Sequence, residues 1–373
     1  MATAPSTRSA SLPRTATLLR QALLPVGVSL GTMALVLGLT YEPGLRDQVA
    51  TAIRWPWVGV ALVAALSRLA FGGAWVRFLS ERRLSWWQGT RSYLAREFFS
   101  AITPSAVGGA PLAATAVGKS TVLSVGEAAS VLVFVMVMDH VWYVLVALVV
   151  LIASGSFALF PAENTFGFGV LVAYSIGLAA WTTLLAYATI VRTAWLGKAI
   201  GVVTKVPGLR RFQTKISGGM ERLEIQAARF RGRSVRFYAT SLGYAALTNL
   251  SRYALIVAVL WSFVPDVPAL LTVARAAVLW LVALVMPTPG GAGGVEGLFL
   301  LFFGAYMMGA LKAPILLFWR LLDYALVLAL GVASTAATVQ RMVIERLWDE
   351  DGDSTARVLD GVPTADLSSS SRP

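Results

Sequence analysis

No cysteine occurs among the 373 residues, and there is one histidine, His140. The missing thiols exclude disulfides, thiolate catalysis and cysteine-ligated metals, and one histidine leaves little for a zinc site or a histidine-based triad. Charged residues make up only 13% of the chain, whereas 57% of the residues are hydrophobic and the mean hydropathy is +0.71. This composition lies outside the range of soluble domains. It indicates a polytopic membrane protein, and we expect no enzymatic activity, cofactor or metal.

The apolar residues are grouped into segments that are long enough to cross a bilayer core, which needs about 20 helical residues. Two further apolar regions, 92–118 and 269–311, are interrupted by proline and glycine. We therefore predict an all-α fold, a polytopic bundle of transmembrane helices. The predicted full spans are residues 23–40, 57–79, 127–153, 168–191, 235–261 and 313–339.

Lysine and arginine predict the orientation of these spans. The loop at 192–236 is rich in both, whereas 154–167 and 262–269 contain neither. Basic loops are retained in the cytoplasm, so the first segment is cytoplasmic and the other two are external. With a cytoplasmic N-terminus, 92–118 must then enter and return on the cytoplasmic side, and 269–311 must do so on the outside. Both regions are predicted to be re-entrant hairpins.

The segments outside the membrane suggest the domain boundaries. Residues 1–20 and 349–373 are polar and low in aromatics, and we expect disordered cytoplasmic tails on a transmembrane domain at 21–348. Apolar residues within the basic loop recur at helical spacing, which favours a helix lying on anionic lipid headgroups over a partner-binding helix. Basic residues beside the apolar spans, retained on the cytoplasmic side, explain the net charge of +12, so we expect a cell-membrane protein with no nucleic-acid partner.

The two interrupted regions resemble each other. Asp139 follows Gly109 by 30 residues, Asp323 follows Gly293 by the same number, and an arginine precedes each break, Arg91 and Arg275. Together with their opposite orientations, this similarity predicts two inverted repeats, each with a re-entrant hairpin broken by proline and glycine. The breaks contain Pro104, Gly108 and Gly109 in "TPSAVGGAP", and Pro289, Gly290, Gly291, Gly293 and Gly294 in "PTPGGAGGVEG".

A broken helix exposes backbone groups that hydrocarbon cannot satisfy. A helix that restarts after the glycines presents free N–H groups and the positive end of its dipole, which suits a phosphate. The alternative is that the glycines only allow close helix packing. Two such breaks in opposed hairpins favour the binding interpretation.

Charged side chains within the apolar segments are further candidates, because each would cost about 2.5–3.5 kcal/mol at a helix centre. Arg275 and Arg320 either bind a lipid phosphate or neutralise carboxylates. We predict a ligand role for Arg275 and an ion pair between Arg320 and Asp323, three positions apart on one helix face. The remaining charged candidates are Arg68, Asp139, Arg252 and Glu296.

Two of these polar residues have open alternatives. Glu296 either caps the N-terminus of a helix or takes part in binding a cationic headgroup or a proton. His140, next to Asp139, is either a buried, hydrogen-bonded histidine or a proton relay.

The two proline-glycine elements, together with "WRLLDY", resemble the flippase-like integral membrane family that includes the transmembrane region of lysylphosphatidylglycerol synthases. The resemblance covers about residues 20–345. Members often carry an arginine shortly before the acidic residue of the first repeat, but here Met136 occupies that place. The soluble aminoacyl-transferase domain of the full synthases is also missing, so we do not expect the chain to make lysylphosphatidylglycerol by itself.

This resemblance implies translocation of a polar-headed lipid. We expect an anionic or aminoacylated lipid, of the phospholipid or polyprenyl-phosphate type, as the membrane substrate. The alternatives are a carrier of a small soluble anion or ion, and an integral-membrane transferase. A lateral cleft open to lipid would favour the translocase, whereas a sealed central cavity would favour the soluble-anion carrier. The sequence leaves open whether the chain forms a homo-oligomer.

Overall fold

The computed structural model describes residues 43–103, 109–153, 165–187, 229–286 and 288–334, with a few positions between 27 and 41. Within these residues the regular structure is helical throughout, with no strand. The predicted all-α fold is therefore confirmed. The two chain termini, most of the span predicted at 23–40 and most of the basic loop lie outside the described residues.

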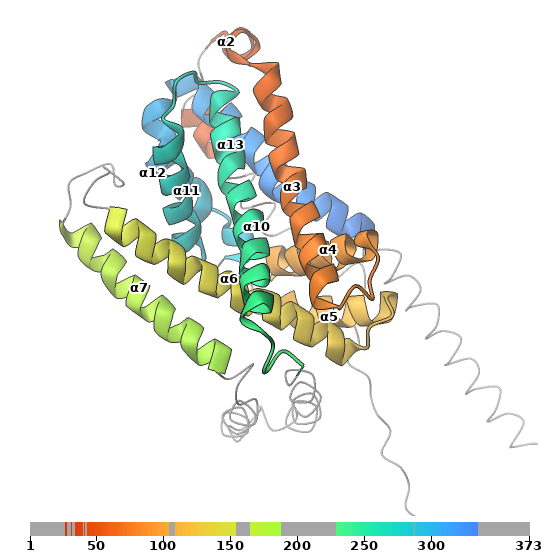
Figure 1. Ribbon diagram of the computed structural model, residues 1–373. Coiled ribbons are helices and arrows are strands. Elements are labelled where there is room, and N and C mark those ends of the chain that lie inside the picture. The colour runs from red at the N-terminus through yellow and green to blue at the C-terminus, as the bar shows by residue number, and fades with distance from the viewer. Residues whose placement is uncertain are drawn as a thin grey trace, which may run out of the picture.

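The N-terminal half contains three long helices that match predicted spans. The spans expected at 57–79 and 127–153 are formed by α3 and α6, and the span expected from 168 is formed by α7 (Figure 1). A pair of shorter helices, α4 and α5, lies between α3 and α6 in the sequence. The helices are α2 (Leu45–Ala52), α3 (Trp55–Leu79), α4 (Trp86–Ile102), α5 (Gly109–Ser120), α6 (Val125–Ala153) and α7 (Thr165–Ala186).

The C-terminal half repeats this order of long and short helices. A long helix, α10, is followed by a broken pair, α11 and α12, and then by the helix at Gly309–Ser334, which includes α13 and a π turn. Five described helices are long and apolar enough to cross a membrane. The elements are α10 (Val235–Trp261), α11 (Ala269–Ala283), η4 (Pro289–Gly291), α12 (Gly294–Phe303), η5 (Gly304–Tyr306), η6 (Gly309–Leu311), α13 (Lys312–Arg320) and η7 (Leu321–Ala325).

Local sequence signals explain where several helices begin. The Ser85 hydroxyl accepts the N–H of Gln88 at 3.2 Å and the Gln88 side chain accepts the N–H of Ser85 at 2.9 Å, a capping box that starts α4. The Ser234 hydroxyl caps α10 in the same way. Proline in the first turn of α3 lacks only an N–H that would have no helical partner there.

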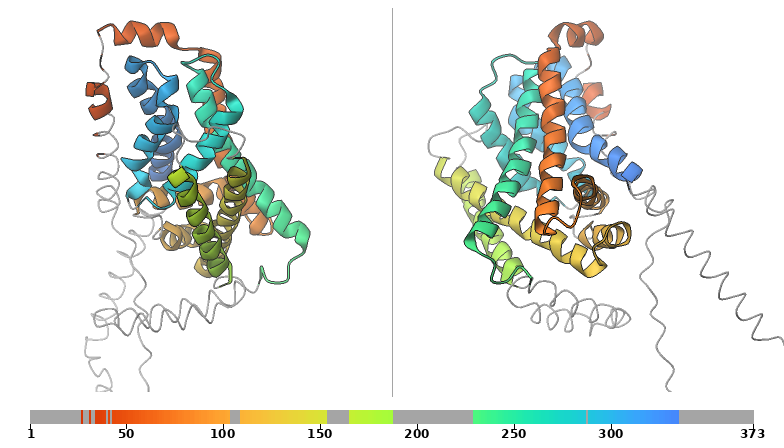
Figure 2. Two further views of the ribbon diagram at one scale, coloured as in Figure 1. Left: turned by 90° about the vertical axis from the view of Figure 1, so that its left-hand side faces the viewer. Right: turned by 45° about the vertical axis from the view of Figure 1, so that its right-hand side comes forward.

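Small residues allow the helices of the first half to approach closely. A Cβ atom added to Gly89 of α4 would lie 2.4 Å from the carbonyl oxygen of Gly73 on α3, so the two backbones are nearly in contact. On the other side of α3, the indole of Trp75 donates to the hydroxyl of Ser241 on α10 at 2.7 Å. Packing against both neighbours therefore fixes the position of α3 (Figure 2).

Two buried apolar clusters fill the bundle. One is formed mainly by α10, α11, α12 and α13, and the other mainly by α3, α4, α5 and α6. Trp142 of α6 packs against both clusters. In Figure 1, α7 lies beside α6 at the edge of the molecule.

Candidate functional site

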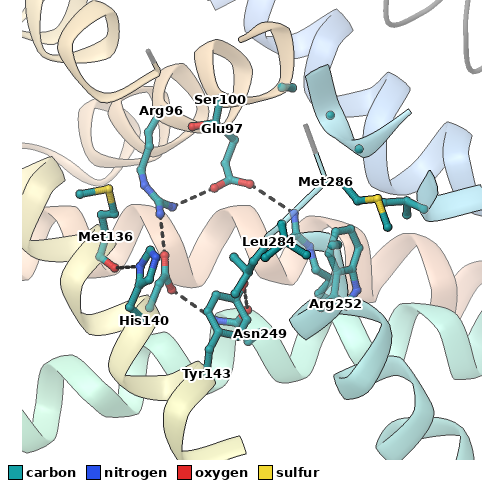
Figure 3. Close-up of a pocket in the computed structure, with 18 of the residues that line it drawn as sticks. Arg96, Glu97, Ser100, Met136, His140, Tyr143, Asn249, Arg252, Leu284 and Met286 are labelled. Atoms are coloured by element: carbon teal, nitrogen blue, oxygen red, sulfur yellow. Dashed lines mark hydrogen bonds and ion pairs between the residues drawn. The ribbon is translucent and has the colours of Figure 1, made fainter. Parts of the chain in front are cut away.

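A cavity of about 980 Å³ lies between the two halves of the bundle. Its wall is formed by α3, α4, α6, α7, α10 and α11, by the η4 turn and by the C-terminal helix. Most of this wall is apolar, but ionised side chains gather on one part of it (Figure 3). A large apolar cavity with a few convergent polar groups has the usual form of a ligand site.

The ionised group is centred on α4. Nη1 of Arg96 lies 2.9 Å from Oε1 of Glu97, and its Nη2 lies 2.6 Å from Oδ2 of Asp139 on α6. Glu97 also forms an ion pair with Arg68 on α3. Two neighbouring residues of one helix therefore connect α3, α4 and α6 at the cavity wall (Figure 3).

Asp323 forms a second centre on the opposite part of the network. Its Oδ1 atom lies 3.0 Å from Nη1 of Arg68 and 3.4 Å from Nε of Arg252. Arg252 also approaches Glu97 at 3.5 Å, and its guanidinium carbon lies 3.9 Å from the centre of the Trp280 ring. Arg252 has the longest ion-pair contacts of the cavity arginines, while stacking on the indole fixes the plane of its guanidinium group.

Hydrogen bonds orient the carboxylate of Asp139. Nδ2 of Asn249 donates to Oδ1 of Asp139 at 3.3 Å, and the Tyr143 hydroxyl donates to Oδ1 of Asn249 at 3.1 Å. The tyrosine thereby turns the amide so that its NH₂ group faces the carboxylate. On the same helix, Nδ1 of His140 lies 2.8 Å from the carbonyl oxygen of Met136.

The predicted ion pair between Arg320 and Asp323 is wrong. Nε and Nη2 of Arg320 instead lie 2.8 and 2.7 Å from Oε1 of Glu296. The physical reason is the π turn at Leu321–Ala325, which places an extra residue in the turn and rotates Asp323 off the face that carries Arg320. Asp323 therefore meets Arg68 and not its neighbour on the same helix.

The contacts of Glu296 match the capping alternative. Its Oε2 atom accepts the backbone N–H of Gly293 at 2.8 Å, immediately before α12 begins at Gly294. The carboxylate is 0% exposed, so the Arg320 guanidinium is its required counter-charge. A carboxylate of the chain itself thus occupies the helix N-terminus that the sequence predicts for a phosphate.

The glycines of the second break give the chain a tight turn at the cavity. Gly290 and Gly291 line the cavity and have φ values of 61° and 67°, which L side chains rarely adopt. A Cβ atom on Gly290 would also lie 2.4 Å from the ring of Tyr324. Close packing is therefore one function of these glycines, and phosphate binding by the turn stays a prediction.

Two arginines predicted for the site lie elsewhere. Arg91 is exposed on α4 and is not part of the cavity wall. Arg275 is buried on α11, where Nη1 donates to the carbonyl of Phe302 and to the hydroxyl of Tyr306, both at 3.0 Å. Arg275 therefore joins α11 to the end of α12, and it too is outside the wall of the cavity.

The other predicted residues are divided between the cavity, its surroundings and the undescribed part of the chain. Pro104 and Gly108 lie outside the described residues, and Gly109 is the first residue of α5. Pro289 begins the η4 turn. The structure brings together at the cavity wall Asp139, Arg252, Gly290, Gly291, Arg320 and Asp323.

Sequence reasoning missed the central pair of the site, Arg96 and Glu97. The signal was present as two adjacent charges within the apolar region 92–118, where each is costly unless it is paired. The spacing of 13 residues to Pro104 instead predicts Arg91 as the arginine of this hairpin. The guanidinium of Arg96 reaches Asp139 from α4, while Met136, three residues before Asp139 on α6, carries no charge.

The cavity reaches the protein surface between α7 and the end of α11. Trp181 and Val285 both line the cavity and are 54% and 62% exposed. Beside them, the Tyr174 hydroxyl donates to the carbonyl of Leu281 at 2.5 Å, which links α7 to α11. The opening is therefore bordered by apolar side chains.

Comparison with known proteins gives one family. The family model described as "Lysylphosphatidylglycerol synthase TM region" matches residues 23–331. This range includes every ionised residue of the cavity network. No curated protein sequence matches the chain.

Proposed function

The chain belongs to the family of lysylphosphatidylglycerol synthase transmembrane regions, and from this membership we propose that it translocates a polar-headed lipid across the bilayer. The family and the five long apolar helices make it a multi-pass membrane protein with a lipid-related function. The proposed substrate is an anionic or aminoacylated lipid, of the phospholipid or polyprenyl-phosphate type. The proposal requires no enzymatic step.

The observation that carries this proposal is the combination of a charged wall with an apolar opening. Arginines and carboxylates inside the cavity offer hydrogen bonds to a headgroup. At the opening, Trp181 and Val285 are exposed, and Trp181 belongs to α7, a helix long and apolar enough to cross a membrane. A lipid whose headgroup enters between α7 and α11 can leave its chains in the bilayer. A soluble substrate has no such chains and does not need an apolar opening.

The ends of the α4–α5 pair support a re-entrant hairpin in the first half. Arg83, just before α4, lies 2.5 Å from Oε1 of Glu127 at the start of α6, and it donates to the carbonyl of Val122 at 3.2 Å. The pair therefore begins beside the turn where it ends. A hairpin that enters and returns on one side requires this proximity.

Arg68 and Arg252 support the inverted repeats. Arg68 lies 36 residues before Pro104, and Arg252 lies 37 residues before Pro289. Their helices, α3 and α10, pack against each other, and both arginines reach Asp323. Corresponding residues that meet at the centre are expected when two halves are related by a twofold axis in the membrane plane.

The basic loop suggests which side of the protein is cytoplasmic. At its end, Arg229 lies 2.8 Å from Glu127 and Arg233 forms an ion pair with Glu81 in the turn after α3. The positive-inside rule makes this side, and both termini, cytoplasmic in the cell membrane. Anionic lipid headgroups are the proposed partners of the loop, and the formation of a homo-oligomer stays open.

The two other functions are supported less well. A carrier of a small soluble anion could use the same arginines, but such an anion has no apolar part that the opening would accommodate. A transferase needs a nucleophile or an activating metal, and the carboxylates of the cavity network are all bound to arginine. Among the described residues no group of three or more metal-binding side chains could hold a metal ion.

Reconstitution tests the proposal directly. Fluorescent phosphatidylglycerol in proteoliposomes should become accessible to an impermeant quencher from both leaflets, at a rate that increases with the amount of protein. Vesicles with Thr183→Ala, an exposed change on α7 away from the cavity, provide a matched control. Two results together would support the soluble-anion carrier instead. The lipid would be quenched at equal rates in vesicles with and without protein, and only the vesicles with protein would take up soluble glycerol phosphate.

A further inference from the structure

The ionised side chains of the cavity balance one another. Each arginine in the wall forms an ion pair with a carboxylate, and there are as many carboxylates as arginines. The resting cavity therefore offers a headgroup no net positive charge. The arginines of the wall are Arg68, Arg96, Arg252 and Arg320; the carboxylates are Glu97, Asp139 and Asp323 in the wall, and Glu296, which lies outside the wall as the partner of Arg320.

A phosphodiester lipid would disturb this balance by adding one negative charge. An uncompensated charge is costly in a cavity whose wall is mostly apolar, and ionisable groups respond by binding or releasing protons. One proton bound to a neutral base in the wall would restore neutrality. The base must be accessible from the cavity and must have a free lone pair.

His140 has the geometry of such a base. Its ring lines the cavity beside Arg96 and Tyr143 (Figure 3). Nδ1 lies 2.8 Å from the Met136 carbonyl oxygen, and because a carbonyl only accepts hydrogen bonds, Nδ1 carries the hydrogen of the neutral ring. Nε2 then retains its lone pair. Imidazole is also the side chain that ordinarily changes charge between pH 5 and 8.

Building on the translocase function proposed above, we propose that each phosphodiester lipid enters the cavity together with one proton, which binds to Nε2 of His140. The phosphate pairs with Arg252, the arginine with the longest ion-pair contacts, and the imidazolium supplies the missing positive charge. On the other side of the membrane the lipid and the proton leave together. The cycle moves one proton with each lipid and no net charge.

The surroundings of His140 are compatible with a positive ring. Asp139, the preceding residue, shares the cavity with it and is paired with a single arginine, Arg96. In addition to the ionised residues named above, the titratable groups of the wall are Tyr93, Tyr143, Tyr174 and Tyr324. The described parts of α5 and α11 pack on α6 but place no charged side chain in the wall.

The first test compares two driving forces on the wild-type protein. Proteoliposomes contain fluorescent phosphatidylglycerol, together with a pH-sensitive dye in the lumen. A gradient of one pH unit should redistribute the lipid between leaflets by up to about tenfold, because coupling to one proton transfers the full gradient to the lipid. The dye should report one proton per lipid. A potassium diffusion potential at equal pH should redistribute nothing.

The outcomes separate the coupling from the translocase function. Lipid that follows the potential and ignores the pH gradient would overturn the coupling while leaving translocation in place. No movement of lipid under either condition would overturn the translocase function itself. Proton-coupled uptake of soluble glycerol phosphate without lipid movement would assign the site to a soluble phosphate and would overturn the lipid coupling.

The second test uses His140→Gln, which retains hydrogen-bonding groups but cannot take up a proton. The variant, matched to wild type by its size-exclusion profile, should lose redistribution by the pH gradient and become sensitive to the potential. Redistribution by pH that persists in the folded variant would show that another group carries the proton. If the variant does not fold, the wild-type comparison decides the coupling by itself.

Discussion

Arg252 and Arg320 carry the same charge but are held in different ways. Arg320 lies within 2.8 Å of the Glu296 carboxylate, and both side chains are almost fully buried. Arg252 keeps distances of 3.4 and 3.5 Å from its carboxylate partners. We therefore expect Arg320 to contribute mainly to stability and Arg252 mainly to binding of the headgroup.

Replacing Arg320 by alanine should destabilise the protein by about 3–5 kcal/mol, because Glu296 would be left as a buried charge without a partner. Adding Glu296→Gln should restore part of this loss, since the amide is neutral and can still accept the N–H of Gly293. Thermal unfolding in detergent measures both effects. Strictly additive losses in the double variant would show that the two residues are not coupled.

Arg252→Ala should lower the rate of lipid translocation by about tenfold or more, because a charge-assisted hydrogen bond contributes about 1.5–3 kcal/mol. Its unfolding temperature should fall less than that of Arg96→Ala, whose arginine has contacts of 2.6 and 2.9 Å. The quencher assay measures the translocation rate, and thermal unfolding in detergent measures the unfolding temperatures. A well-folded Arg252→Ala protein with the wild-type rate would place phosphate binding elsewhere.

At the scale of elements, the contact between α3 and α4 positions the charged centre of the site. Arg68 lies on α3, and Arg96 and Glu97 lie on α4. Their ion pairs depend on the close approach of the two helices at Gly73 and Gly89. A change that separates the helices should therefore weaken the network without altering any charge.

Gly89→Ala should destabilise the protein by about 1–3 kcal/mol, because the new methyl group would meet a backbone carbonyl that cannot move aside. Gly243→Ala on α10 is the matched control, since no atom lies within 4 Å of a Cβ atom there. The control should be neutral or up to about 1 kcal/mol more stable, as alanine is the better helix former. Equal effects of the two changes on the unfolding temperature would refute the tight contact.

The boundaries of the long helices were predictable because they depend on local properties. The span expected at 235–261 is helix α10 at Val235–Trp261, and the span expected at 57–79 begins two residues earlier as α3. Apolar length and flanking polar residues are sufficient for such predictions. The sequence contains no comparable signal for the π turn in the last helix. Because of this turn, Asp323 pairs with Arg68 and not with Arg320.

At the scale of the whole molecule, the choice of ion-pair partners was not predictable from spacing. Asp139 pairs with an arginine 43 residues away, and Asp323 pairs with Arg68 from the other half of the chain. The cost of buried charges correctly marked Asp139 and Asp323 as candidates. Which arginine reaches each one depends on helix packing, and this is a long-range property.

The proposed topology can be tested with single cysteines, because the chain has no cysteine of its own. Cysteine at Pro265, exposed in the loop between α10 and α11, should react with an impermeant maleimide on intact cells. Cysteine at Lys119, exposed near the end of α5, should react only after the membrane is opened. Labelling of Lys119→Cys on intact cells would mean that the face with the ends of the α4–α5 pair is external, which would overturn the proposed orientation.

The sharing of Asp323 by two arginines makes the two halves of the protein unequal. Arg68 and Arg252 occupy corresponding positions of the proposed repeats, and both contact Glu97 of α4 as well as Asp323 of the second half, whereas Asp139 in the first half is bound by Arg96. A carrier built from identical halves would spend equal time open to each side. For the translocase proposed above, we therefore expect the two access states to differ in their ion pairs and in energy, so that one of them is the preferred resting state and lipid supplied from one leaflet meets an open site more often than lipid supplied from the other.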